Sequence, residues 1–416
     1  QSVAAVGGAC VDGGARAERR CLCERRRLCG RRRTFTRPFR RVIVLRIDPF
    51  QSERLLSLWQ NKVDYDFTET GVHPMFLHEL VSREELDEIY ASVQLRYIQT
   101  DGPPPLKEAI CGLYEACGHE NLLVTNGSAE ANFLAVWHLV EPGDRVVAVL
   151  PNYMQVPGVA RGFGAEVVPV YLRPEHAWGL DLEELEGAVR PGAKILYVTN
   201  PNNPTGAVLS AAEMDAVVAA AEAAGAWLLA DEVYRGAELD GESSPSFWGR
   251  YQKTIVVGWL SKADTLPGLR LGWVLTDPEL AATLWCYHDY TTISTNAVSE
   301  RLARLALRPE VRARILERNH TISKRNLRGL SDWLAAHGDT FNFVPPRIGG
   351  VAFVGYNLPL GSTELVMQLL QEHSVLVVPG EAFGADRYLR IGYGNPRLLE
   401  GLALINETIE RLRASM

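Results

Sequence analysis

The chain has 416 residues, of which 47% are apolar and 22% are charged, and its formal net charge is −7. This length can bury large cores and predicts two or three units of domain size. No run of about 18 uncharged apolar residues exists, which argues against a membrane-spanning helix. Collagen-like, low-complexity and coiled-coil compositions are excluded as well, so we expect a soluble globular protein.

The charge is unevenly distributed along the chain. Residues 1–40 contain 11 arginines and only three acids, so this segment carries about +8 and the remainder about −15. Four of the seven cysteines also lie there. A disulfide framework would need more cysteines in a smaller domain. We therefore expect a reducing, cytoplasmic setting.

Residues 1–41 show neither helical nor strand periodicity, and they predict a basic, disordered extension. Three functional interpretations are open: a nucleic-acid-binding arm, an organelle transit peptide, or a metal site that uses Cys21, Cys23 and Cys29. The cysteine spacing lacks a paired C-x₂-C and a nearby histidine, which argues against zinc. No apolar segment follows the charges, which argues against a secretory signal. We favour a non-functional extension, such as one produced by a misplaced start.

Elements with clear periodicity begin near residue 42. Helical spacing of apolar residues predicts helices at 50–59, 74–93 and 106–117. Strands then alternate with helices, notably those at 129–139 and 211–224, and this alternation predicts a mostly parallel, doubly wound sheet. The short apolar runs that predict buried strands are 121–125, 145–150, 166–171, 194–199, 227–230, 254–260 and 272–275.

The sequence becomes helical after residue 277 and returns to strands at residues 341–393, which predicts a smaller α+β domain at the C-terminus. Residues 300–328 combine alternating charge with Leu and Ile and predict a connecting helix. The predicted strands are 341–344, 350–356, 375–378 and 388–391, and the predicted helices are 362–372 and 396–415. We therefore divide the chain into the extension (1–41), a segment associated with the small domain (42–80), a large domain (81–295), and a connecting helix with the small domain (296–416).

Polar residues directly after the strands are the candidates for chemistry, because open α/β sheets bind ligands beyond the carboxyl ends of their strands. Gly127 and Ser128 form a turn into a helix that suits a phosphate, although an ordinary helix cap has the same composition. The run Asn-Pro-Asn-Asn-Pro-Thr-Gly at 200–206 is more constrained than most turns.

Two further strand ends are candidates, one with an acid and the other with a lysine. Asp231, followed by Tyr234, ends a buried strand, where a carboxylate is costly unless it meets a cation such as magnesium or a protonated heterocycle. Ser261 and Lys262 lie at the mouth of the next strand, where a lysine among apolar residues is a candidate nucleophile. A phosphate cradle, an amide, a buried acid, a tyrosine and a lysine together predict a site for pyridoxal 5′-phosphate (PLP).

The motifs at 200–206, 231–234 and 261–273 resemble the signature of the class I/II aminotransferases, PLP-dependent enzymes of fold type I. The resemblance covers roughly residues 47–413. It implies a large α/β domain with a mostly parallel, doubly wound sheet and a smaller α+β domain. It also implies PLP as cofactor, no metal, an amino acid and a 2-oxo acid as substrates, and a homodimer with shared active sites. Neither nucleic acid nor membrane is an implied partner.

The same resemblance assigns roles by position. Lys262 is similar to the Schiff-base lysine that also moves the substrate proton, and Asp231 to the partner of the pyridine nitrogen. Asn203 and Tyr234 are similar to residues that bond the phenolic oxygen, with Asn203 also close to substrate, and Arg390 resembles the arginine that grips the α-carboxylate bidentately. The other implied cofactor residues are Gly127, Ser128, Ala129, Ser261 and Arg270 at the phosphate, Tyr153 stacked on the ring, and Tyr97, which reaches a neighbouring subunit's phosphate.

Three departures from the family pattern concern the substrate. Trp259 stands where the family often has a phosphate-binding serine, three residues before the lysine. Asp264 stands where an aromatic residue is common, and it would repel acidic substrates or attract a cationic side chain unless it is a solvated loop acid. Residues 70–74 take the place of the substrate-lining entry loop that is usual in the family, and no role is assigned to them.

We therefore expect an aminotransferase with a ping-pong cycle. A second interpretation keeps PLP but makes the enzyme a lyase, or a cyclase of the kind that builds capreomycidine from hydroxyarginine. A third is a non-catalytic, PLP-binding transcription regulator that uses residues 1–41 as a DNA arm. Such regulators carry a whole winged-helix domain upstream, and the segment here is shorter.

Overall fold

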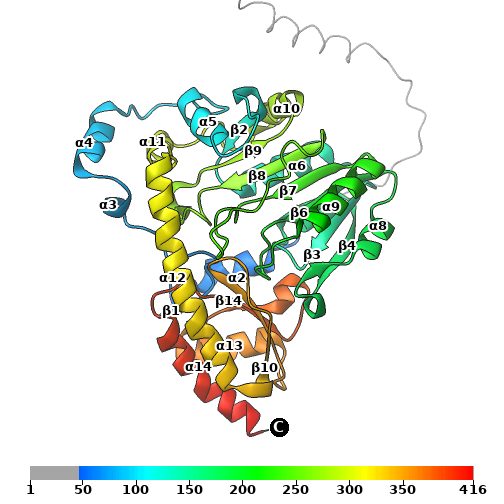
Figure 1. Ribbon diagram of the computed structural model, residues 1–416, viewed down its shortest axis with the longest axis vertical. Coiled ribbons are helices and arrows are strands. Elements are labelled where there is room, and N and C mark those ends of the chain that lie inside the picture. The colour runs from blue at the N-terminus through cyan, green and yellow to red at the C-terminus, as the bar shows by residue number, and fades with distance from the viewer. Residues whose placement is uncertain (1–45, 416) are drawn as a thin grey trace, which may run out of the picture. The chain divides into compact units, whose positions relative to one another are not determined.

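An eight-stranded sheet organises the larger part of the chain. The computed structural model describes residues 46–415, so the extension predicted for residues 1–41 lies outside the described part (Figure 1). The strand order is β2-β9-β8-β7-β6-β3-β4-β5. The strands are β2 (Leu122–Thr125), β3 (Arg145–Leu150), β4 (Glu166–Arg173), β5 (Gly179–Leu180), β6 (Ala193–Thr199), β7 (Trp227–Asp231), β8 (Thr254–Trp259) and β9 (Gly272–Leu275).

Most neighbouring strands of this sheet are parallel. The parallel pairs are β3 with β4, β3 with β6, β6 with β7, and β7 with β8. β9 runs antiparallel to both β2 and β8, and β5 runs antiparallel to β4. The predicted mostly parallel, doubly wound sheet is confirmed. The carboxyl ends of β3, β6, β7 and β8 consequently meet at one edge.

Helices cover both faces of the sheet, which explains why its strands are apolar throughout. Side chains alternate between the faces along each strand. In β6, Ile195 and Tyr197 belong to one core, while Leu196 and Val198 belong to the other. The first core includes α6 (Ser128–Leu139), α7 (Gln155–Gly162) and α10 (Pro278–His288), and the second includes α5 (Pro104–Cys111), α8 (Leu182–Ala188), α9 (Ala211–Ala224) and α11 (Ala297–Ala306).

A smaller antiparallel sheet lies at the other end of the described chain, and the long helix α12 (Pro309–Ala336) reaches from the large sheet to it (Figure 1). Its strands, in the order β10-β11-β14-β13, are β10 (Phe341–Phe343), β11 (Val351–Tyr356), β14 (Tyr388–Gly392) and β13 (Val378–Pro379). Its core includes residues of α12, α13 (Ser362–His373) and α14 (Leu398–Arg413). The predicted α+β composition of this region is confirmed.

The segment before the large sheet contributes to the cores of both sheets. It contains α2 (Gln51–Trp59), β1 (Tyr65–Asp66), α3 (Leu77–Leu80) and α4 (Arg83–Ser92). β1 pairs in parallel with β12 (Val375–Leu376), and α2 packs on the core of the small sheet, whereas buried residues of α3 and α4 belong to the core that includes α5 and α11. Phe67 follows β1 and is fully buried. Its N–H donates to the Leu376 carbonyl over 2.8 Å, and its own carbonyl accepts from Gly392 N–H over 2.7 Å. Gly401 on α14 leaves the space that the Phe67 ring fills.

Two predicted helices are each divided in the structure. The stretch predicted at 74–93 forms α3 and α4, because Val81 is extended and the Ser82 hydroxyl caps α4 by accepting from Glu85 N–H. The stretch predicted at 300–328 forms α11 and α12, because Arg308 is extended and Pro309 occupies the first position of α12. α7, α8, β1 and β5 were not predicted from the sequence, whereas α10 lies in the stretch after residue 277 that was predicted to be helical.

Cys111 at the end of α5 forms a disulfide with Cys117, a bridge that the sequence analysis did not foresee. The Cα atoms are 5.2 Å apart, and Cys286 is free among the described residues. The bridge closes only the short turn after α5, so it does not form a disulfide framework that would hold a domain together. Within residues 46–415 we find no helix whose length and apolar composition would let it cross a membrane.

The Phe67 contacts predict a measurable loss of stability. Phe67→Ala should lower the free energy of unfolding by about 3–5 kcal/mol, because it leaves a cavity between β1 and α14. Phe67→Leu should cost less, since it fills more of that space. Urea unfolding followed by circular dichroism measures both values. Equal stability of Phe67→Ala and the unchanged protein would contradict this packing.

Candidate active site

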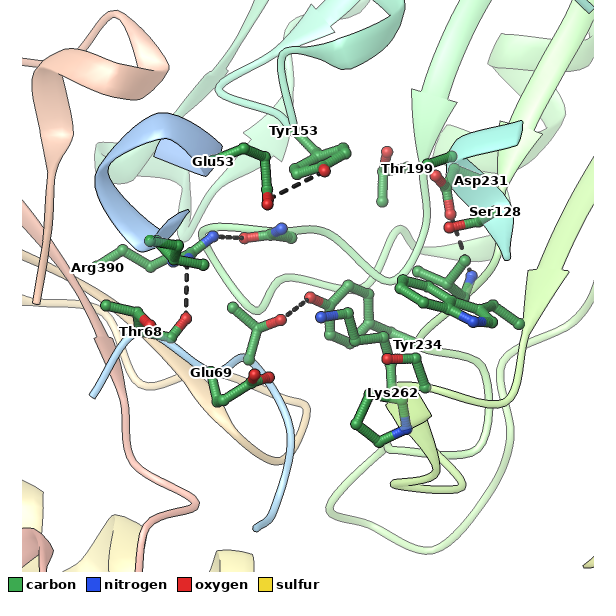
Figure 2. A pocket seen from close by; sticks show the side chains of 18 of the residues that line it. Glu53, Thr68, Glu69, Ser128, Tyr153, Thr199, Asp231, Tyr234, Lys262 and Arg390 are labelled. Carbon is green, nitrogen blue, oxygen red and sulfur yellow. Dashed lines mark hydrogen bonds between the residues drawn. The ribbon is translucent and has the colours of Figure 1, made fainter. Parts of the chain in front are cut away.

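A cavity of about 340 Å³ opens at the carboxyl edge of the large sheet (Figure 2). Residues that follow β2, β3, β6, β7 and β8 line it, and Arg390 of β14 reaches it from the small sheet. The structure thus brings together residues that are up to 337 positions apart, from Glu53 to Arg390. The predicted site residues in its lining are Ser128, Ala129, Tyr153, Asn203, Asp231, Tyr234, Ser261, Lys262, Arg270 and Arg390.

Asp231, the last residue of β7, is a buried carboxylate at the floor of this cavity, 3% exposed. Its oxygens accept hydrogen bonds from Asn132 Nδ2 at 3.1 Å and from Val233 N–H at 3.2 Å. Burial raises the pKa of Asp231 to about 6, although these two donors and the charge of Lys262 oppose the rise. None of the ion pairs among the described residues includes Asp231, so its charge calls for a cationic ligand group.

Asn132 is a residue that the sequence analysis missed. It lies one helical turn after Ser128 on α6, and its side chain is 1% exposed. The spacing of four residues from Ser128 was a usable signal, because residues i and i+4 share a helix face.

Three groups at the start of α6 form a cradle for an anion. Gly127, the N-cap of α6, has a φ of +85°, and a Cβ at this position would lie 2.9 Å from Arg270 Nη2. The Arg270 guanidinium lies 4.8 Å from the centroid of the Trp259 ring. Trp259 Nε1–H is buried and has no hydrogen-bond partner among the described residues. A helix N-terminus, an arginine and an unpaired N–H together suit a phosphate.

Only one of the three asparagines in the 200–206 motif lines the cavity. Asn200 Oδ1 accepts from Leu209 N–H at 2.9 Å, and Asn202 Oδ1 accepts from the Thr205 hydroxyl at 2.7 Å, so both hold the loop. Asn203 lines the cavity, and its Oδ1 accepts from Arg390 Nη1 at 3.3 Å. The constrained turn therefore presents one amide to the site.

Arg390 is 3% exposed, which is unusual for an arginine. Its Nη2 donates to the Thr68 carbonyl at 2.8 Å, while Nε is buried without a partner among the described residues. Burial lowers the pKa of Arg390, and nearby acids and tyrosines, including Tyr234 and Glu53, oppose that shift. A guanidinium that lines a cavity and has an N–H group without a partner is suited to bind a carboxylate.

Two tyrosines of the cavity are held by residues of the segment before the large sheet. The Tyr234 hydroxyl donates to Thr70 Oγ1 at 2.6 Å, and the Tyr153 hydroxyl donates to Glu53 Oε1 at 3.0 Å. Burial raises the pKa of Tyr153 well above its ordinary value, and the Glu53 carboxylate raises it further. Tyr153 therefore stays neutral and keeps its hydroxyl proton.

The structure also places Asp264, Tyr97 and the unassigned residues 70–74. Asp264 does not line the cavity: it is buried and paired with Arg312 Nε at 2.8 Å, so it is neither a solvated loop acid nor a contact for substrate. Tyr97 is 75% exposed and lies outside the cavity of its own chain. Of the unassigned residues 70–74, Thr70 lines the cavity.

The sequence was compared with known families and proteins. The family model described as aminotransferase class I and II matches residues 79–403. The chain belongs to this family. Members require PLP, and PLP is its cofactor. The prediction of a PLP-dependent enzyme of fold type I is confirmed.

Individual relatives cover most of the chain. Capreomycidine synthase from Streptomyces vinaceus is 32% identical over 83% of this chain and 89% of its own length. Aspartate aminotransferase from Streptomyces avermitilis is 30% identical over 76% of this chain and 82% of its own. The crystal structure of a PLP-dependent aminotransferase from Streptococcus suis is similar with a TM-score of 0.83 and 33% identity, and covers 88% of this chain and 99% of that one.

The residues of the cavity fit this cofactor. A buried acid without a cationic partner suits a protonated pyridine nitrogen, and the anion cradle at α6 suits the phosphate. Lys262 lines the cavity with its Nζ 5.5 Å from the centroid of the Trp259 ring, next to the cradle.

The raised pKa of Asp231 predicts a pH-dependent stability of the cofactor-free protein. The folded state holds a proton that the unfolded chain releases at its ordinary pKa of 3.8, so stability is lost as the pH rises from about 4 to about 6. The loss should total about 3 kcal/mol. Asp231→Asn should remove this component. Urea unfolding of both proteins between pH 4 and 7 measures it, and identical pH profiles would refute the shift.

Proposed function

We propose that this PLP-dependent enzyme is an aminotransferase, which moves an amino group from an L-amino acid to a 2-oxo acid by a ping-pong mechanism. The observation that carries the proposal is that Lys262, Asp231 and Arg390 line one cavity. A base, an acid for the cofactor ring and a carboxylate-binding group are the three elements that proton transfer at an amino-acid Cα requires.

The proposed cofactor contacts follow from the lining of the cavity. Asp231 pairs with the pyridine nitrogen, and Asn203 and Tyr234 bond the phenolic oxygen. Bound PLP supplies an electron sink for charge that develops at the substrate Cα. The residues proposed to hold the phosphate are Gly127, Ser128, Ala129, Ser261 and Arg270, and Tyr153 stacks on the ring.

The chain's own catalytic groups act on the substrate. Arg390 binds the α-carboxylate through its guanidinium, and Asn203, which is bonded to Arg390, lies close to the bound substrate. Lys262 Nζ takes the proton from Cα and returns it on the cofactor side. Arg390 and Asp231 are nearly inaccessible to solvent, which strengthens both charge interactions.

We also propose a homodimer with shared active sites. Tyr97 is assigned to the neighbouring subunit's phosphate, and its exposure in the single chain is compatible with that role. Phe76, Tyr90 and Leu95 of the same region are exposed as well. Large apolar side chains gathered on one exposed segment are typical of a protein interface.

Lys262→Ala tests the core of the proposal. The unchanged holoenzyme, mixed with a suitable amino acid, should convert the absorbance of its bound PLP to that of pyridoxamine phosphate and release the 2-oxo acid. In Lys262→Ala the rate of pyridoxamine phosphate formation should fall by about a hundredfold to ten-thousandfold, the usual contribution of a positioned acid–base group. Lys324→Ala, an exposed lysine of α12, is the control. A Lys262→Ala enzyme with full turnover would refute the assignment.

The same measurement addresses a second candidate function. The similarity to capreomycidine synthase favours a PLP-dependent cyclase or lyase as the alternative. Ring closure or ammonia release, without formation of pyridoxamine phosphate, would contradict transamination and support this alternative.

Trp259 is proposed to bind the phosphate through its unpaired Nε1–H, in place of the serine common in the family. Trp259→Phe keeps most of the ring but removes the donor, so PLP should bind about tenfold to a hundredfold more weakly, the usual loss for a hydrogen bond to a charged group. Equilibrium dialysis of the apoprotein with PLP measures this. Trp248→Phe, whose Nε1 instead donates to the Glu115 carbonyl, is the control. Equal PLP affinity in Trp259→Phe and the unchanged protein would exclude the contact.

A further inference from the structure

Two glutamates line the cavity on the same side as Arg390, and no role in the cofactor chemistry accounts for them. Glu53 lies on α2 and Glu69 follows β1, so both come from the segment before the large sheet. Figure 2 shows both carboxylates directed toward the cavity from the side of Arg390, across from Asp231 and Ser128. The substrate bound to Arg390 therefore extends into an acidic environment.

Each of these carboxylates accepts one hydrogen bond from a neutral donor at one oxygen, and its other oxygen accepts none from a described residue. Glu53 Oε1 accepts from the Tyr153 hydroxyl at 3.0 Å, and Glu69 Oε1 accepts from Gln60 Nε2 at 3.3 Å. Neither Oε2 accepts a hydrogen bond from another described residue, and no Lys, Arg or His nitrogen of residues 46–415 forms an ion pair with either side chain. Each carboxylate thus has one oxygen without a hydrogen-bond or ion-pair partner among the described residues, which a ligand can contact.

The charge balance of the cavity explains what these acids would recognise. Arg390 lines the same cavity, is 3% exposed, and has an Nε without a partner among the described residues, so an anionic substrate group belongs on Arg390. A second anionic group would meet Glu53 and Glu69 at close range in a poorly solvated space and be repelled. An apolar side chain would leave both carboxylates partly desolvated without a partner. A cationic side chain would pair with both carboxylates.

We propose that the substrate is an amino acid with a cationic side chain, a guanidinium or an ammonium group, which Glu53 and Glu69 bind while Arg390 binds the α-carboxylate. This inference rests on the proposed function in that the amino acid occupies the PLP site. The specificity of the enzyme is then set by the segment before the large sheet. Asp264, the acid that the sequence suggested for this purpose, is neutralised by Arg312.

The test measures the binding and turnover of arginine, ornithine, norleucine and glutamate by the holoenzyme. Binding is read from the change in PLP absorbance on mixing, and turnover from the 2-oxo acid released. Arginine or ornithine should bind at least about tenfold more tightly than norleucine, which corresponds to one charged hydrogen bond, and glutamate should bind worst. Equal or tighter binding of norleucine or glutamate would overturn the inference.

Matched variants assign the preference to the two carboxylates. Glu53→Gln and Glu69→Gln keep an oxygen that accepts from Tyr153 or Gln60, so each removes the charge with little change in packing. Each should raise KM for the cationic substrate about tenfold, with KM for norleucine unchanged within about twofold. Glu242→Gln, an exposed loop acid outside the cavity, is the control. Parallel changes in KM for arginine and norleucine would show a structural role and contradict the proposal.

The outcomes separate this inference from the proposed function. If norleucine forms pyridoxamine phosphate as well as arginine does, the transaminase proposal stands and the cationic preference fails. If arginine binds preferentially and its binding depends on Glu53 and Glu69, but no pyridoxamine phosphate forms, the cationic preference stands and transamination fails.

Discussion

The buried charge of Asp231 is the constraint around which the site is arranged. A carboxylate at the end of a central strand, with two neutral donors and no ion pair to another described residue, is costly until a positively charged group lies against it. A protonated pyridine ring meets that requirement. The sheet supplies a rigid floor for this charge, and the loops after the neighbouring strands supply the phosphate cradle, the amide and the lysine around it.

The second charged group, Arg390, comes from the small sheet, so the cavity requires both sheets and the segment before the large sheet. Phe67 and β1 tie that segment to β12 and β14, and the same segment then delivers Thr68, Glu69 and Thr70 to the cavity. Packing in the small domain therefore determines the position of substrate-binding groups. We therefore propose that the large sheet holds the cofactor, while the small sheet and the segment before the large sheet select the substrate.

Much of the fold was predictable because strands covered on both faces are apolar throughout. The bounds of β3, β9 and α9 agree with their predictions, whereas α11 and α12 were merged because the periodicity continues across Pro309. Candidate cofactor residues could also be located, because they follow predicted strands whose ends must meet. Glu53 and Glu69 could not be located in this way, since no local pattern shows that α2 packs against β13 or that β1 pairs with β12. The pairing of Asp264 with Arg312, 48 residues away, was equally invisible in sequence.

The central claim is that Lys262 carries the cofactor in this cavity, opposite Asp231. The most direct measurement reduces the holoenzyme with borohydride, digests it and locates the phosphopyridoxyl group by mass spectrometry. The account predicts one labelled peptide, with the group on Lys262, and no label in Lys262→Ala. A label on another lysine, or a label that persists in Lys262→Ala, would contradict it.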